Sequence, residues 1–252
     1  MFTSAHGFLN LRDGLTTIMA PLFHTWLLRT MDSTGLTRSK HMGGTAGYGG
    51  FAIIGVFYSA AYGWSDPREK HRSFLDLLVS DDGLNWRKHS RIAGEEDKPN
   101  EADLLFQGDG ELWCIARSGR SPDHSLFYYS KPPYLEWGRI DLKITIHCPV
   151  FCKCGDKILV AGRRHMSAQW IPQDTPAGNT GIFVVKAHGA VEPFFALPSC
   201  GDAAYPGLIS CDRDRIIISY YSQHAYLGGV IDGDISAPLN IADIYVAEIA
   251  LE

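Results

Sequence analysis

The sequence predicts an all-β fold, and the spacing of its strands predicts a β-propeller of four-stranded antiparallel blades. Helical periodicity is nearly absent, and short runs rich in β-branched and aromatic residues recur along the chain instead. Polar turns containing Gly, Asp or Asn separate many of these runs, as reversals between antiparallel strands require. The turns at Gly110, Gly155 and Asp212 lie roughly 45 to 57 residues apart, the length of a propeller blade.

Each expected strand is an apolar run bounded by turn residues. These strands are residues 51–59, 73–79, 111–117, 125–130, 157–162, 181–186, 215–222 and 243–251. Three units repeat an apolar strand, a tight turn and a second strand: 104–106 with 112–117, 150–151 with 158–163, and 208–209 with 216–221. A β-sandwich also alternates, but it gives no reason for this theme to return at blade spacing.

The repeated units set the expected domain organisation. An earlier unit covers residues 51–86, and a poorer one covers the first forty residues. We therefore expect one β-propeller domain over residues 1–252, with about five blades or an incomplete six-bladed ring. Residues 1–50 form a divergent or truncated first blade in this interpretation, and residues 51–252 form the regular ones.

Composition restricts the possible partners. The 252 residues are 45% hydrophobic and 20% charged, which is typical of a globular protein. With 23 Lys and Arg against 28 Asp and Glu, the net charge of −5 argues against nucleic acid as a partner. No apolar run approaches the roughly 18 residues that a membrane span needs, so we expect no membrane partner. The oligomeric state stays open.

The first residues lack the basic segment and apolar run of a secretory signal. The chain as it stands therefore predicts a cytoplasmic protein. It predicts a periplasmic or secreted protein if a leader has been removed.

Six cysteines are too few for a disulfide framework in a chain of this length. Cys148, Cys152 and Cys154 lack the spacing of a zinc knuckle, so free, partly buried thiols are expected rather than a zinc site. We predict no metal and no cofactor, although the sequence leaves a structural Ca²⁺ open.

The segment SDDGLNW at 80–86 predicts a stapled hairpin turn. Ser80 and Asp82 supply oxygens that accept backbone N–H groups, Gly83 supplies a positive φ, and Trp86 packs beneath the turn. The segment resembles the Asp-box of sialidases and related propellers, in a form one residue shorter. The resemblance implies a structural role for these residues.

Three further segments resemble sialidase motifs. NEADLLF at 100–106 precedes a DG turn and a strand that ends at Arg117, LVAGRR at 159–164 ends in two arginines, and GDAAYPGL at 201–208 precedes ISYYS at 218–222. The order of these motifs over residues 51–252 is similar to that of bacterial sialidase-like proteins. In that family a glutamate activates a tyrosine nucleophile and three arginines bind the substrate carboxylate.

The resemblance implies specific roles for residues of this chain. Tyr205 is the implied nucleophile, Glu101 its base, and Arg117 with Arg163 or Arg164 the carboxylate clamp. The other expected substrate-binding residues are Asp202, Tyr221 and His224. A phenol suits a substrate whose anomeric carbon carries a carboxylate, because it avoids like-charge repulsion but needs an adjacent base.

The chain departs from the sialidase pattern near its start. Neither the acid/base aspartate motif nor the first arginine motif is present; the nearest residues are Arg12, Asp13, Arg29, Asp32 and Asp66. The favoured function is a sialidase-like exo-glycosidase that acts on a terminal, acidic sugar of a glycan. The alternatives are another propeller carbohydrate-active enzyme (a neutral-sugar glycosidase or a polysaccharide lyase) and a glycan-binding propeller without catalysis. A two-carboxylate glycosidase would pair Glu101 or Asp103 with Asp202.

Overall fold

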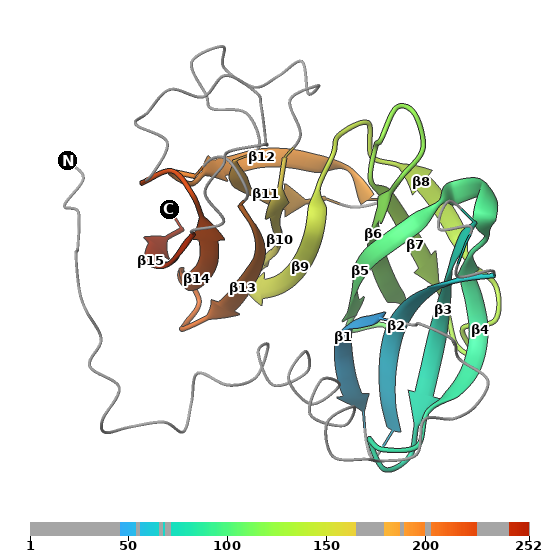
Figure 1. Cartoon of the computed structure of the whole chain (residues 1–252). Coiled ribbons are helices and arrows are strands. Elements are labelled where there is room, and N and C mark those ends of the chain that lie inside the picture. Colours follow the sequence, from blue (N-terminus) through green and yellow to red (C-terminus); the bar gives the residue numbers. More distant parts are fainter. Residues whose placement is uncertain are drawn as a thin grey trace.

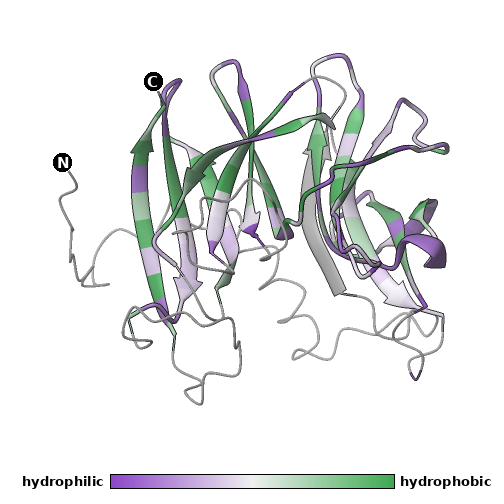
Figure 2. Ribbon diagram, turned by 90° about the horizontal axis from the view of Figure 1, so that it is seen from above, coloured by the Kyte–Doolittle hydropathy of each residue, from purple (hydrophilic) through white to green (hydrophobic). Residues whose placement is uncertain are grey.

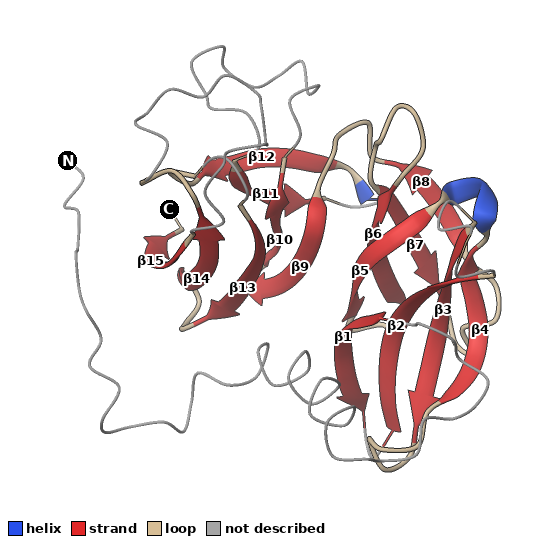
Figure 3. Ribbon diagram, in the orientation of Figure 1, coloured by secondary structure: helices blue, strands red, loops and turns tan. Residues whose placement is uncertain are grey.

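A computed structural model describes residues 46–53, 56–65, 68, 72–164, 179–186, 189–199, 203–225 and 242–251. These residues form an all-β structure, in which the 3-10 helix η1 (Glu95–Asp97) precedes the second sheet (Figure 3). The strands are β1 (Ala46–Ile53), β2 (Val56–Trp64), β3 (Ser73–Ser80), β4 (Arg87–Ala93), β5 (Pro99–Phe106), β6 (Leu112–Ser118), β7 (Leu126–Ser130), β8 (Gly138–Asp141), β9 (His147–Cys154), β10 (Lys157–Arg163), β11 (Thr180–Val185), β12 (Val191–Ala196), β13 (Ala204–Ser210), β14 (Arg215–Ser222) and β15 (Asp243–Ala250).

The strands form four antiparallel sheets in chain order: β1–β4, β5–β8, β9–β12 and β13–β15. The first strand of each sheet lies beside the first strand of the next, so β1, β5, β9 and β13 are the inner strands of successive blades. Figure 1 shows the four sheets following one another around an arc. The prediction of a β-propeller with four-stranded antiparallel blades is confirmed, with β13–β15 three-stranded within the described residues. The expected first unit, in the first forty residues, lies outside them.

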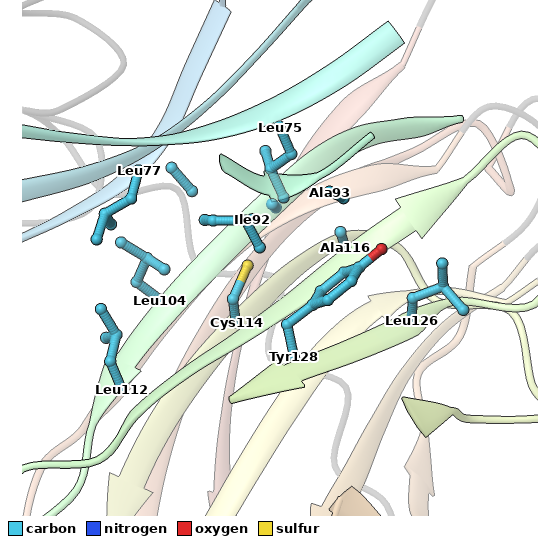
Figure 4. Packing of buried hydrophobic residues seen from close by; sticks show 12 residues of the cluster. Leu75, Leu77, Ile92, Ala93, Leu104, Leu112, Cys114, Ala116, Leu126 and Tyr128 are labelled. Carbon is cyan, nitrogen blue, oxygen red and sulfur yellow. The ribbon is translucent and has the colours of Figure 1, made fainter. Parts of the chain in front are cut away.

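Each pair of neighbouring sheets encloses one apolar cluster. Leu104 faces the cluster shared with the first sheet, whereas Leu105 faces the cluster shared with the third. This alternation follows from the two-residue period of a strand, which sends successive side chains to opposite faces. Figure 4 shows the first cluster, in which Leu75 and Leu77 meet Cys114 and Tyr128, and Figure 2 shows the hydrophobic residues along the strands. Burying one such leucine contributes about 1.5–3 kcal/mol.

Every inner strand carries a bulge near its beginning. The register shifts between Tyr48 and Gly50 in β1 and between Pro99 and Ala102 in β5. The equivalent shift in β9 lies opposite Ala161 and Arg163, and the one in β13 lies between Ala204 and Gly207. A bulge bends its strand and redirects the side chains beside it. Corresponding side chains of successive blades are therefore redirected at the same level of the propeller.

The turn between β3 and β4 contains the expected hydrogen bonds. Asp82 Oδ1 accepts the backbone N–H groups of Leu84 and Asn85 at 2.8 and 2.7 Å. Ser80 Oγ accepts the N–H of Gly83 at 2.9 Å, and Gly83 has a φ of 73°. The indole N–H of Trp86 donates to the Gly83 carbonyl at 3.1 Å. These hydrogen bonds stabilise the hairpin turn through the side chains of the turn itself.

Within the described residues, no helix has the length and apolar character needed to cross a membrane.

Candidate functional site

The three residues expected to carry the chemistry meet at one end of the propeller. Glu101 lies near the beginning of β5, Arg117 near the end of β6, and Tyr205 near the beginning of β13. Because β6 runs antiparallel to β5, its end lies at the level where β5 begins. The inner strands of successive blades lie side by side, so the beginnings of these strands gather at the same end of the propeller (Figure 1).

Glu101 is the centre of this group. The residue is 6% exposed. Arg117 Nη1 donates to both carboxylate oxygens, at 3.2 and 3.3 Å, and the phenol O–H of Tyr205 donates to Oε1 at 3.5 Å. A carboxylate so placed can accept the proton of the phenol, and the ion pair with Arg117 offsets the cost of burying its charge. The structure thus brings together three residues that lie up to 104 positions apart in the chain.

Tyr205 is held in an unusual backbone conformation. It lies in the β13 bulge with a φ of 47°, and 49% of its surface is exposed. Its ring stacks on Tyr221, at the end of β14, with ring centroids 6.3 Å apart and an interplanar angle of 21°. A non-glycine residue with positive φ is uncommon and is often found at functional positions. The phenol is therefore both accessible and restrained.

The two arginines at the end of β10 have different surroundings. Arg163 is half-buried, and its Nη2 lies 3.4 Å from Nδ1 of His147. Arg164 is 4% exposed and its Nε donates to Asn179 Oδ1 at 2.7 Å; burial lowers its pKa. The charge of Arg163 acts on Cys148, on which the charge of Glu101 also acts, so Arg163 lies near the Glu101 group. Arg163 is the better placed candidate for a carboxylate clamp, and the role of both stays a prediction.

Of the remaining expected substrate-binding residues, the structure describes His224 but not Asp202. His224 follows β14; its Nδ1 lies 2.9 Å from Ser222 Oγ and its ring 4.4 Å from that of Tyr245. Burial lowers the pKa of His224, which favours the neutral imidazole. Asp202 lies outside the described residues, as do the early candidates Arg12, Asp13, Arg29, Asp32 and Asp66.

Cys148 is a member of this group that the sequence did not indicate. Its thiol lies beside the backbone N–H and the phenol of Tyr205, and the charges of Glu101 and Arg163 act on it. The sequence suggested only a metal role for Cys148, which the spacing argued against. A signal was nevertheless present, since Cys148-Pro149 and Tyr205-Pro206 begin their inner strands in the same way.

Across the described residues, no three His, Cys, Asp or Glu side chains are grouped so that they could hold a metal ion. The described cysteines, which are Cys114, Cys148, Cys152, Cys154 and Cys211, are all free thiols.

No protein-family model and no curated protein matches the sequence. Among solved structures, a protein of unknown function from Dyadobacter fermentans DSM 18053 is similar in fold, with a TM-score of 0.64 and 16% identity over 82% of this chain and 54% of its own. The endosialidase of phage phi92 has a TM-score of 0.55 and 12% identity over 82% of this chain and 36% of its own. The chain thus spans about half and about a third of these two proteins. At such identities the likeness shows the fold alone.

Proposed function

We propose that the chain is a carbohydrate-active β-propeller enzyme, and more specifically a sialidase-like exo-glycosidase that hydrolyses a terminal, acidic sugar from a glycan. The observation that carries the proposal is the hydrogen bond from the exposed phenol of Tyr205 to the buried carboxylate of Glu101. An unperturbed phenol has a pKa near 10 and is a weak nucleophile at neutral pH, so a base within hydrogen-bonding reach is the feature that this chemistry needs.

The reaction follows from this pair. The phenol oxygen of Tyr205 attacks the anomeric carbon as its proton passes to Glu101, the bond from that carbon to the leaving oxygen breaks, and the leaving oxygen takes a proton from solvent. Water then attacks the anomeric carbon of the tyrosyl–sugar intermediate and releases one proton to solvent, while Glu101 returns its proton to the departing phenol oxygen. Arg117 stabilises Glu101 as the ionised base before attack.

Arginine accounts for the preference for an acidic sugar. Both contacts between Arg117 and Glu101 use Nη1, so they leave the Nε and Nη2 donors of the guanidinium for a substrate carboxylate. Arg163, at the end of β10 in the next blade, supplies a second guanidinium near Cys148. The similarity in fold to a protein named as an endosialidase makes sialosides the first substrates to test.

The first test removes the nucleophile. Tyr205→Phe is expected to lower kcat on an aryl sialoside by roughly 10²–10⁴-fold, because the ring and its stacking on Tyr221 stay while the reacting oxygen is lost. Tyr129→Phe is the matched control, since Tyr129 is also a surface tyrosine, at 38% exposed, on β7. A panel of acidic and neutral aryl glycosides gives the rates, and thermal unfolding shows that both variants are folded. Undiminished turnover by Tyr205→Phe would remove Tyr205 from the mechanism.

The second test concerns recognition of the carboxylate. Arg117→Lys keeps the positive charge beside Glu101 but loses the planar guanidinium, so affinity for an acidic sugar should fall by about tenfold or more. Affinity for a neutral sugar should not change. Titration calorimetry with one acidic and one neutral monosaccharide measures both constants, and an equal loss for the two sugars would argue against a carboxylate clamp. Hydrolysis of neutral glycosides alone would favour another class of propeller glycosidase.

A further inference from the structure

Cys148 occupies the same place in its blade as Tyr205 does in its own. It is the second residue of β9, lies in that strand's bulge with a φ of 50°, and precedes a proline. Tyr205 is the second residue of β13, lies in the bulge with a φ of 47°, and also precedes a proline. Since β9 and β13 are adjacent inner strands, the repeated geometry directs both side chains to the same level of the propeller.

Cys148 lies outside the apolar clusters that contain the other buried thiols of the described residues. Cys114 belongs to the cluster between the first two sheets, and Cys152 and Cys154 to the cluster between the last two. Cys148 is 6% exposed and belongs to none of the three clusters. Its thiol instead lies beside the backbone N–H and the phenol of Tyr205. A residue that only filled space would be expected to contact apolar side chains.

The thiol is neutral under physiological conditions. Burial raises the pKa of Cys148 to about 12, and the negative charge of Glu101 contributes to this rise. A neutral thiol has one weak donor and a weakly accepting sulfur, so it can hydrogen-bond to an oxygen in either direction. A methyl group cannot do so, whereas a hydroxyl can.

We propose that Cys148 is a positioning residue for Tyr205: its S–H donates to the phenol oxygen while the phenol O–H donates to Glu101, and this hydrogen bond strengthens when the phenol proton has left. The proton itself goes to Glu101, and the thiol keeps its own proton throughout, so no charge is created on sulfur. The catalytic role of this contact rests on the proposed function, whereas its effect on the Tyr205 pKa is independent of that function.

The test measures the phenol of Tyr205 directly. Protein is prepared with tyrosine isotopically labelled at Cζ, the Tyr205 resonance is identified by its loss in Tyr205→Phe, and its pKa is obtained by NMR titration. Cys148→Ala should raise the Tyr205 pKa by roughly 0.5–1 unit, because a hydrogen bond to an ionised oxygen is stronger than one to its neutral form. Cys148→Ser should hold the pKa at or below the wild-type value.

Cys152→Ala is the matched control. Cys152 is on the same strand, is 8% exposed, and is bonded by the N–H of Ser210 at the opposite end of β13. Cys152→Ala removes a buried thiol of β9 but leaves the surroundings of Tyr205 unchanged. The Tyr205 pKa should therefore stay at the wild-type value. An equal shift in Cys152→Ala and Cys148→Ala would show a general loosening of β9 and would overturn the proposal.

Turnover separates this proposal from the function on which it rests. If sialosides are hydrolysed, Cys148→Ala should lower kcat about 3- to 10-fold with little change in KM, and Cys148→Ser should restore it. If no variant hydrolyses any glycoside while the pKa shift is present, the proposed function is wrong and the positioning role stands. An unchanged Tyr205 pKa in Cys148→Ala overturns the positioning role, whatever the activity. If Cys148→Ala does not fold, a Tyr205 pKa above the wild-type value in Cys148→Ser overturns it.

Discussion

Single residues fix the geometry of the bulges that hold the site. Gly162 in β10 faces the bulge of β9, where Cys148 and Pro149 form the extra length of strand. A Cβ on Gly162 would lie 2.7 Å from the carbonyl oxygen of His147 and would also meet Cγ2 of Ile146. A backbone atom cannot move aside as the end of a flexible side chain can. The close approach of β9 to β10 therefore requires glycine at this position.

We expect Gly162→Ala to destabilise the fold by about 1–3 kcal/mol, the usual cost of overpacking a filled interior. The control is Gly108→Ala, since a Cβ at Gly108 meets no atom within 4 Å. Urea unfolding measures both. A urea midpoint for Gly162→Ala equal to that of Gly108→Ala would show that β9 can move away from β10 without a loss of stability.

At the scale of elements, the hairpin between β3 and β4 shows how a short motif fixes a turn. Asp82 accepts two backbone N–H groups and is also bonded by Ser80 Oγ and Asn85 Nδ2, at 2.9 and 2.6 Å. The hydrogen bonds from Asn85, followed by those from Leu84 and Ser80, lower the pKa of the Asp82 carboxyl. The carboxylate therefore favours the folded hairpin whenever it is ionised.

Replacement of Asp82 tests this staple. Asp82→Ala should lower the melting temperature at pH 7 while leaving kcat on any substrate unchanged. The contribution is fully present above the unfolded pKa of about 4 and is lost as the pH falls through the lowered folded value. The difference in melting temperature between wild type and variant should consequently shrink in acid. Asp81→Ala is the control, because Asp81 makes only a 3.9 Å ion pair with Arg87, and an equal effect of the two variants would contradict a specific staple.

The strands were predictable to different degrees, for identifiable reasons. β3, β6, β7, β10, β11, β14 and β15 match expected runs closely, because apolar alternation and turn residues bound them clearly. The expected strand 51–59 is wrong as a single element, since it covers the end of β1 and the beginning of β2. Apolar residues continue through that reversal, so composition alone does not mark it. The outer strands β4, β8 and β12 were not predicted, because most of their side chains are at least partly exposed and lack a strong alternation.

The candidate site was predictable in part. The motifs around Glu101, Arg117 and Tyr205 indicated these residues, and the structure brings all three together. Cys148 was not indicated, because its contact with Tyr205 depends on bulges in two different inner strands. A bulge depends on which residues face each other across a sheet, and one-dimensional spacing does not specify this register.

At the scale of the whole molecule, neighbouring blades are joined through their inner strands. Asp103 on β5 accepts the backbone N–H of Phe151 on β9 at 2.8 Å, and Lys153 Nζ donates to the carbonyl of Phe106 at 2.6 Å. Further round the ring, the thiol of Cys154 on β9 donates to the Asp212 carbonyl at 3.2 Å. Glu101 and Tyr205 lie in different blades, so the separation of their oxygens depends on such contacts. Of these groups, Asp103 is the buried carboxyl.

Burial raises the pKa of Asp103 to about 6, although the N–H groups of Phe151 and Leu104 favour the ionised form. The folded protein therefore binds this proton more tightly than the unfolded chain, whose aspartate pKa is near 4. The protonated Asp103 therefore contributes stability that is fully present below pH 4 and is lost as the pH rises through about 6. The difference of two pKa units corresponds to roughly 3 kcal/mol in the free energy of unfolding.

Asp103→Asn should remove this pH dependence, because the amide carries no charge and its oxygen can still accept the Phe151 N–H. Relative to wild type, the free energy of unfolding of Asp103→Asn should be similar at pH 4 and higher by up to roughly 3 kcal/mol at pH 7. Asp103→Leu is the control, since it also removes the charge but leaves the Phe151 N–H without an acceptor, and it should be less stable than Asp103→Asn by about 1–3 kcal/mol at both pH values. Urea unfolding at the two pH values decides the matter. A constant difference between Asp103→Asn and wild type would mean that Asp103 titrates alike in the folded and unfolded chain, and the carboxylate would then join the blades at no cost from its burial.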